Sequence, residues 1–253
     1  MPDTYAVLRA ARGAVFVLAP AVASAQVLSV RPGSFSAPRH WVGADFTVAQ
    51  PLAEFGHIIG SGFGGSANYI FKVDRQGIFG LRVDGSFLNY GNETQRVCFN
   101  FQTCRVQLDV HTSNNIATFG VGAQLTAPSG PVRPYVAGSV GYSYFFTESS
   151  VDGTDDYDRP VASTENYHDG GTEFTGMAGV LIPVSAGRVP VSIDFGARYH
   201  GNGERSYLTK GSIHDNGPGI PPTISAIRTD ANFITYHVGV SIGLRSSSRD
   251  DRR

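Results

Sequence analysis

The chain has 253 residues, of which 31 are glycine and 16% are charged, against roughly 25% charged residues in an average soluble domain. Its net charge of −1 offers no basic surface for nucleic acid, and 41% apolar residues are too many for a disordered chain. It has no apolar run of about 18 residues, which excludes a membrane-spanning helix. What remains is a glycine-rich, aromatic-rich chain in which lysine occurs only at Lys72 and Lys210.

Residues 1–25 predict a cleaved export signal. Two arginines precede the apolar run 14–22, AVFVLAPAV, and an A-x-A cleavage site ends at Ala25. A basic region, a short apolar run and small residues at the cleavage site are the parts of a secretory signal peptide. We expect the mature chain to begin at Gln26, with a periplasmic segment over 26–40, in an oxidising compartment.

The rest of the chain alternates with period two. Between Ile234 and Leu244 every second residue is apolar, and none of the residues between them is large and apolar. Such alternation places one face of a strand against an apolar medium and the other face against a different one. Similar alternation predicts eight strands, over 41–48, 61–73, 78–90, 116–125, 133–144, 173–183, 191–200 and 234–244.

The connections between the predicted strands are short and long in turn. The short ones carry turn residues, as in DRQG at 74–77, PSGP at 128–131 and SAG at 185–187. The long ones include 147–172 and 201–232. Short turns at one end and long loops at the other are typical of an outer-membrane barrel.

These patterns predict an all-β fold, an eight-stranded antiparallel up-and-down transmembrane β-barrel over 41–245, with short periplasmic turns, long extracellular loops and a polar C-terminal tail over 246–253. A secreted lipocalin-like barrel, with the apolar face inside, is the alternative. Its water-facing residues should be Lys, Glu and Gln, whereas here that face is mostly Gly and Ser, which suit the narrow interior of an eight-strand barrel. Aromatic residues near the strand ends, among them Trp41, Tyr90 and Tyr142, fit the girdles of a membrane barrel.

Several segments resemble the small outer-membrane β-barrel family of the OmpA and OmpX type. They are RPYVAGSVGYSY, IDFGARYH, FITYHVGVSIGL, VGADFTVAQPLAEFG, SGFGGSANY and LRVDGSFLNYG. The resemblance covers roughly Trp41 to Leu244, and it implies an exported protein in the outer membrane of a Gram-negative-type bacterium. Because the matching positions are mostly glycine and aromatic, they indicate an architecture and no activity. Unlike many such barrels, the last strand stops near Leu244 and the polar tail RSSSRDDRR follows it.

A set of ionisable residues falls on the polar face of the predicted strands, which faces the inside of the barrel. They are Asp45, Arg82, Asp84, Asp194, Arg198, His200 and His237. Charges cannot lie unpaired in so narrow a space. We therefore interpret them as a charge-paired network that holds the lumen shut, with a proton or ion path as the alternative.

The segment from Asp109 to Asn114 contains H-x-S-N, which looks like the His/Ser fragment of the outer-membrane lipid A deacylases. His111 and Ser113 would then act as base and nucleophile. The acid expected further along is missing, because Leu125 takes its place. The sequence therefore predicts no enzyme, and we interpret both residues as ordinary polar residues near the end of a strand.

The only cysteines, Cys98 and Cys104, predict a disulfide across a loop hairpin of an exported protein.

The segment 147–172 is acidic and predicts a solvated loop, with Ca²⁺ binding as the alternative, although its spacing differs from that of an EF-hand loop. The candidate Ca²⁺ ligands are Asp152, Asp155, Asp156 and Asp158.

Together these observations predict a structural or surface-interaction protein of the outer membrane, with recognition carried by its extracellular loops and with no cofactor. The predicted partners are outer-membrane lipid, lipopolysaccharide and a surface ligand, with no nucleic acid, and the barrel is expected to be a monomer. A lipid-modifying enzyme of the deacylase type, and a narrow channel or carrier of small apolar molecules, remain as alternative functions.

Overall fold

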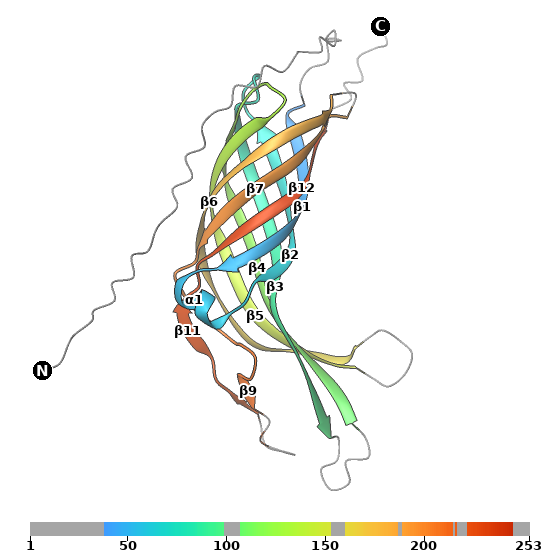
Figure 1. Cartoon of the computed structure of the whole chain (residues 1–253), viewed down its shortest axis with the longest axis vertical. Coiled ribbons are helices and arrows are strands. Elements are labelled where there is room, and N and C mark those ends of the chain that lie inside the picture. The colour runs from blue at the N-terminus through green and yellow to red at the C-terminus, as the bar shows by residue number, and fades with distance from the viewer. Residues whose placement is uncertain are drawn as a thin grey trace, which may run out of the picture. The chain divides into compact units, whose positions relative to one another are not determined.

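The computed structural model describes residues 38–98, 107–152, 160–186, 189–214, 216 and 222–244. Eight of its strands form a closed barrel (Figure 1). These are β1 (His40–Pro51), β2 (Gly62–Lys72), β3 (Phe79–Cys98), β4 (Gln107–Thr126), β5 (Arg133–Asp152), β6 (Pro160–Ser185), β7 (Val191–Gly201) and β12 (Phe233–Leu244).

The ring order of the barrel is β1, β12, β7, β6, β5, β4, β3 and β2, and every pairing is antiparallel. Each strand therefore pairs with the barrel strands that precede and follow it in the chain, and β1 closes the ring against β12. The predicted eight-stranded up-and-down topology is confirmed. We call the end that carries the turns at 73–78, 127–132 and 186–190 the short-turn end, and the opposite end the long-connection end.

The direction of the predicted alternation is also confirmed, with the apolar face outward. Large apolar side chains are exposed on all eight strands; Phe63, Phe119 and Phe174 have exposed fractions of 56%, 58% and 65%. The opposite face is buried and largely polar, as at Thr118 and Ser192. A lipocalin-like barrel requires the reverse arrangement, and an apolar band that continues around every strand is foreign to the surface of a soluble monomer.

Four strands extend well beyond their predicted ends on the long-connection side. β5 continues to Asp152 and β6 begins at Pro160, so much of the predicted loop 147–172 is paired strand. β3 and β4 extend in the same way, to Cys98 and from Gln107. Period-two alternation detects a strand only where its two faces meet different media. Apart from Phe145 and Phe146 on β5, most residues on both faces of these extensions are polar, and so the sequence shows no clear alternation there.

The long connections also contain short elements that the alternation did not predict. One of them is a helix, α1 (Ala53–Ile58), which is too short to show a helical period in the sequence. Between β7 and β12 lie β8 (Glu204–Tyr207), β9 (Ile213–His214), β10 (Thr223–Ile224) and β11 (Ile227–Asp230). β8 pairs with β11 and β9 pairs with β10, and α1 packs beside β11 (Figure 1). Within the described ranges no helix has the length and apolarity needed to cross a bilayer.

Candidate functional site

The candidate site is the interior of the barrel. All of the ionisable residues that the sequence placed there point inward, and none has more than 9% of its surface exposed. They are Asp45, Arg82, Asp84, Asp194, Arg198, His200 and His237. The structure divides them into groups at different depths, each held together by polar residues from neighbouring strands.

The central group is organised by one carboxylate that binds two arginines. Nε of Arg82 donates to Oδ1 of Asp84 at 3.0 Å, and Nη1 of Arg198 donates to Oδ2 of the same carboxylate at 2.9 Å. Arg82 Nη1 also donates to Oε1 of Gln124 at 2.9 Å. A buried charge is tolerated only when it is paired and hydrogen-bonded, and Asp84 meets both requirements for the two guanidinium groups.

The network continues toward the short-turn end through residues that sequence reasoning missed. Gln124 Nε2 donates to Oγ1 of Thr126 at 3.0 Å, and Nζ of Lys72 donates to the same hydroxyl oxygen at 2.8 Å. Lys72 has the same inward parity as Asn68 on β2, so the alternation itself contained the signal that places it inside.

A second group joins three strands through a tyrosine. The hydroxyl of Tyr135 donates to Oδ1 of Asp194 at 2.9 Å and lies 3.0 Å from Nε2 of His237. Two glycines leave room for these rings, because a Cβ built on Gly179 or on Gly196 would lie 2.6 Å from the ring of Tyr135 or of His237. Tyr135 was missed because an aromatic residue in a membrane barrel is expected on the lipid side.

A third group surrounds His200. Its Nδ1 lies 2.5 Å from Oε1 of Glu173 and its Nε2 lies 3.0 Å from Oγ1 of Thr235. The imidazole also stacks on Phe233, with ring centroids 4.3 Å apart. Glu173 was missed because it is the first residue of the predicted strand 173–183 and directly follows the acidic connection. No alternation there indicates whether its side chain points inward or outward.

Asp45 is the least satisfied of the interior acids. Its Oδ2 accepts hydrogen bonds from Ser66 Oγ at 3.0 Å and from Asn68 Nδ2 at 3.3 Å. Its Oδ1 is buried and makes no hydrogen bond within the described part of the chain. Among the described residues of the barrel strands, Thr47 Oγ1 and Arg133 Nε are also buried without a hydrogen-bond partner.

Toward the long-connection end the interior changes from polar to aromatic. Phe55 of α1 lies against four rings, with centroid distances from 5.0 to 6.5 Å, and it is 1% exposed. The four rings belong to Tyr90, Phe145, Tyr207 and Phe233. We call Phe55 and these four residues the aromatic cluster. The expectation that Tyr90 belongs to an outer girdle was wrong, because Tyr90 shares the inward parity of Leu88 and both are buried.

Buried side chains thus cross the interior at two levels. Charged and polar side chains pair across the middle, and the aromatic cluster fills the barrel beyond them with its ring from α1. An eight-strand barrel is just wide enough for its side chains to fill it. Within the described ranges, no three His, Cys, Asp or Glu side chains come together as metal ligands.

The weaker candidate residues lie elsewhere. His111 Nδ1 is 2.8 Å from Thr94 Oγ1, and Ser113 Oγ accepts a hydrogen bond from Asn115 Nδ2 at 3.0 Å. Both residues lie on the polar extension of β4, with the outward parity of Phe119. Glu148, expected in a loop, lies on β5 directly opposite Ser113 in the strand register.

The predicted disulfide and the candidate Ca²⁺ ligands fall mostly outside the described residues. Cys98 and Asp152 end β3 and β5. Cys104, Asp155, Asp156 and Asp158 lie outside the described ranges, as do the predicted signal peptide and the polar tail.

No protein-family model matches the chain, and no curated protein matches its sequence. Solved structures do resemble it. Neisserial surface protein A (NspA) is 16% identical, with 82% of this chain and 99% of that chain covered and a TM-score of 0.46. The outer membrane protein OprG from Pseudomonas aeruginosa is 11% identical, covering 83% and 98%, with a TM-score of 0.44. The attachment invasion locus protein Ail of Yersinia pestis is 14% identical, covering 81% and 98%, with a TM-score of 0.39. The likeness to small outer-membrane barrels concerns the fold alone.

Proposed function

We propose that the protein is an outer-membrane β-barrel with a closed interior, whose role is structural or is recognition at the cell surface. The observation that supports this proposal is that buried side chains cross the lumen at two levels, in the Asp84 network and in the aromatic cluster. A channel or carrier needs a continuous path through the barrel, and these buried side chains occupy it.

The membrane location rests on the outward face of the barrel. Exposed large apolar side chains continue around all eight strands, from Val42 on β1 to Leu244 on β12. Hydrocarbon is the medium that such a band suits, and a tilted strand needs roughly 9–11 residues to cross it. All eight strands are at least that long.

Recognition is assigned to the long-connection end because most of the described residues outside the band lie there. The extensions of β3 to β6, together with β8 to β11, form a polar, paired surface that barrel closure does not require. Connections of this size in a compact domain are usually functional or disordered. The partners proposed for this surface are lipopolysaccharide or a surface ligand, and outer-membrane lipid surrounds the band of a monomeric barrel.

Two measurements test this proposal directly. Fractionation of the expressing cells should place the protein in the outer membrane with Gln26 at its N-terminus. The purified protein in planar bilayers should show no steady single-channel conductance. Steady conductance would refute the closed interior and would favour transport.

A shortened variant tests where recognition lies. Glu148 and Glu165 are opposite each other in the β5–β6 register, so a short Gly/Ser turn can replace 149–164. We expect a folded barrel, seen as heat-modifiable gel migration, that has lost the lipopolysaccharide or surface binding of the intact protein. The matched control replaces the turn 128–131 at the short-turn end with Gly/Ser and should retain that binding. Unchanged binding after replacement of 149–164 would contradict the role assigned to this extension.

Lipid hydrolysis is the second candidate function, favoured by the position of Glu148 opposite Ser113, two residues along β4 from His111. These residues would supply an acid, a nucleophile and a base on neighbouring strands. We expect no release of fatty acid from lipid A. Release that is lost in Ser113→Ala, with folding unchanged, would replace the surface-interaction proposal with an enzymatic one.

A further inference from the structure

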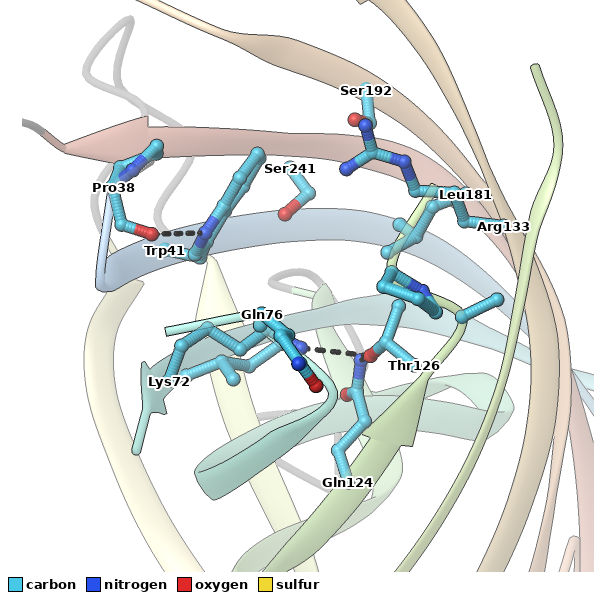
Figure 2. A pocket seen from close by; sticks show the side chains of 14 residues that line it. Pro38, Trp41, Lys72, Gln76, Gln124, Thr126, Arg133, Leu181, Ser192 and Ser241 are labelled. Atoms are coloured by element: carbon cyan, nitrogen blue, oxygen red, sulfur yellow. Dashed lines mark hydrogen bonds between the residues drawn. The ribbon is translucent and has the colours of Figure 1, made fainter. Parts of the chain in front are cut away.

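A cavity of about 160 Å³ lies inside the barrel at the short-turn end. It is bounded by the turns between β2 and β3 and between β4 and β5, with Gln76 and Pro128 on its rim and Trp41 of β1 on one side. Gln124 separates it from the central network through its hydrogen bond with Arg82. Figure 2 shows the lining side chains converging on this space from several strands.

Two cations line the cavity and no acid does. Among its lining residues only Lys72 and Arg133 are charged. Lys72 is 7% exposed, and the single hydrogen bond of its Nζ goes to the neutral hydroxyl of Thr126 at 2.8 Å (Figure 2). Arg133 has no ion pair or hydrogen bond within the described part of the chain, and its Nε is buried without a partner. A buried charge such as that of Lys72, or a buried polar atom such as Nε of Arg133, is costly unless a partner is supplied.

The other lining groups are suited to an anion. The amides of Gln76 and Gln124 and the hydroxyls of Ser192 and Ser241 surround the two cations. Arg133 is half-buried, and in Figure 2 its guanidinium extends toward Ser192 on the cavity wall. A guanidinium and an ammonium with neutral donors around them make the donor set that binds carboxylate or phosphate oxygens.

The nearest carboxylates are occupied elsewhere. Asp84 pairs with Arg82 and Arg198 in the central network. Asp74, in the adjoining turn, accepts hydrogen bonds from the amides of Ile78 at 3.0 Å and Phe79 at 2.7 Å. Asp74 acts on Lys72 only at longer range, and neither Lys72 nor Arg133 forms an ion pair within the described residues, so both can contact a ligand directly.

We propose that this cavity binds a small oxyanion, of the phosphate or carboxylate class, that enters from the short-turn side. The anion would pair with Lys72 and Arg133 and would be held by the surrounding amides and hydroxyls. This inference goes beyond the surface role proposed above, because the cavity lies at the end opposite the recognition surface and needs no open path through the barrel.

The chain contains its own reporter for this site. Trp41 lines the cavity and is the only tryptophan of the protein. Titrating inorganic phosphate into the folded full chain, in phospholipid-free detergent micelles, should change the tryptophan fluorescence saturably. Sodium chloride at the same ionic strength should not reproduce this change.

The variants Lys72→Met and Arg133→Gln should each weaken phosphate binding by about tenfold or more, since each removes a charge-assisted contact. The matched control is Lys210→Met, which removes the other lysine, an exposed one at the long-connection end, and should bind phosphate as the unaltered protein does. If Lys72→Met fails to show heat-modifiable migration, Arg133→Gln decides the result.

Several outcomes would overturn the proposal. One is the absence of a saturable response to phosphate, and another is equal binding by all the variants. Phosphate binding that appears only after deletion of 246–253 would show that Asp250 and Asp251 of the chain's own polar tail occupy the site. A response to added phosphatidylglycerol in the absence of phosphate, with none to free phosphate, would assign the site to a lipid headgroup.

Discussion

Arg198 and Asp84 form an ion pair across the full width of the barrel, with Nη1 and Oδ2 2.9 Å apart. They belong to β7 and β3, which are third and seventh in the ring order and so stand four places apart in a ring of eight. Each strand in such a ring has one strand diametrically opposite, and this contact joins such a pair. The ion pair therefore links opposite walls of the barrel, which hydrogen bonds between neighbouring strands cannot do.

Removing the carboxylate of this ion pair should destabilise the barrel strongly. In Asp84→Ala two buried guanidinium groups lose their carboxylate, a change that typically costs about 3–5 kcal/mol in the free energy of unfolding. Urea titration followed by heat-modifiable migration measures the loss. The control is Glu204→Ala, which breaks the exposed pair with Arg228 at 3.2 Å and should barely move the unfolding midpoint. Equal effects of the two changes would contradict the buried network.

The stability of the aromatic cluster should depend on Phe55, its only member that comes from a helix. Phe55→Ala leaves a cavity among four aromatic rings and should lower the free energy of unfolding by about 3–5 kcal/mol. Ile58→Ala changes the same short helix at a position that is 39% exposed and should cost far less. Because the Asp84 network still closes the middle, Phe55→Ala should remain non-conducting in planar bilayers. Conductance in this variant would show that the aromatic cluster alone seals the lumen.

Gly196 should not tolerate a methyl group. A Cβ at this position would lie 2.6 Å from the His237 ring and 2.8 Å from the carbonyl oxygen of Ala178 on the neighbouring strand. Overpacking of this kind costs about 1–3 kcal/mol. Gly176→Ala is the matched control, because a Cβ there would have no neighbour within 4 Å. Urea unfolding of both variants checks the difference, and indistinguishable midpoints would mean that the Tyr135–His237 group yields without cost.

The turn at 73–78 should give a defined contribution to the pH dependence of stability. Hydrogen bonds from the backbone amides of Ile78 and then Phe79 hold the pKa of Asp74 below its ordinary value. A carboxyl group whose pKa is lowered on folding stabilises the fold above its unfolded pKa of about 3.9. That stabilisation is lost as the pH falls through the lower, folded value. Thermal midpoints between pH 6 and pH 2 should therefore fall more steeply for the unaltered protein than for Asp74→Asn. Parallel curves would show that the carboxylate does not matter to the turn.

The disulfide between Cys98 and Cys104 remains a prediction. Both thiols should resist alkylation in the denatured, unreduced protein, and both should react after reduction. The bridge would tie the ends of β3 and β4 beyond their last described pairing, between Cys98 and Gln107. Two reactive thiols in exported material would refute it.

Alternation along the strands predicted which way most side chains point, and it therefore placed Asp84, Arg198 and His200 correctly inside the barrel. It could not say at what depth each residue lies or what it meets across the lumen, because those relations depend on strand register and barrel closure. For the same reason the sequence did not bring Lys72 and Arg133 to one cavity.

Phe55 and Tyr207 were out of reach for a different reason. They belong to α1 and β8, which are too short for a helical or strand period to be detected in the sequence. The expectation that aromatic residues face lipid also concealed Tyr90 and Tyr135, which line the interior. The extensions of β5 and β6 were missed because most residues on both of their faces are polar.

The unequal strand lengths have one more consequence. β6 is 26 residues long and its neighbour β7 only 11, so β6 from Pro160 to Glu173 pairs with β5 alone. On the other side of the same sheet, β3 beyond Asn89 pairs with β4 alone. Within the apolar band every described strand of the ring is paired on both sides. Beyond the band, β3 and β6 each have a margin without a paired strand, of the kind that can invite an incoming strand, although β8 packs against β6. Charged side chains such as Glu93, Arg96 and Glu165 lie along these margins, which is how natural sheets discourage indiscriminate strand addition.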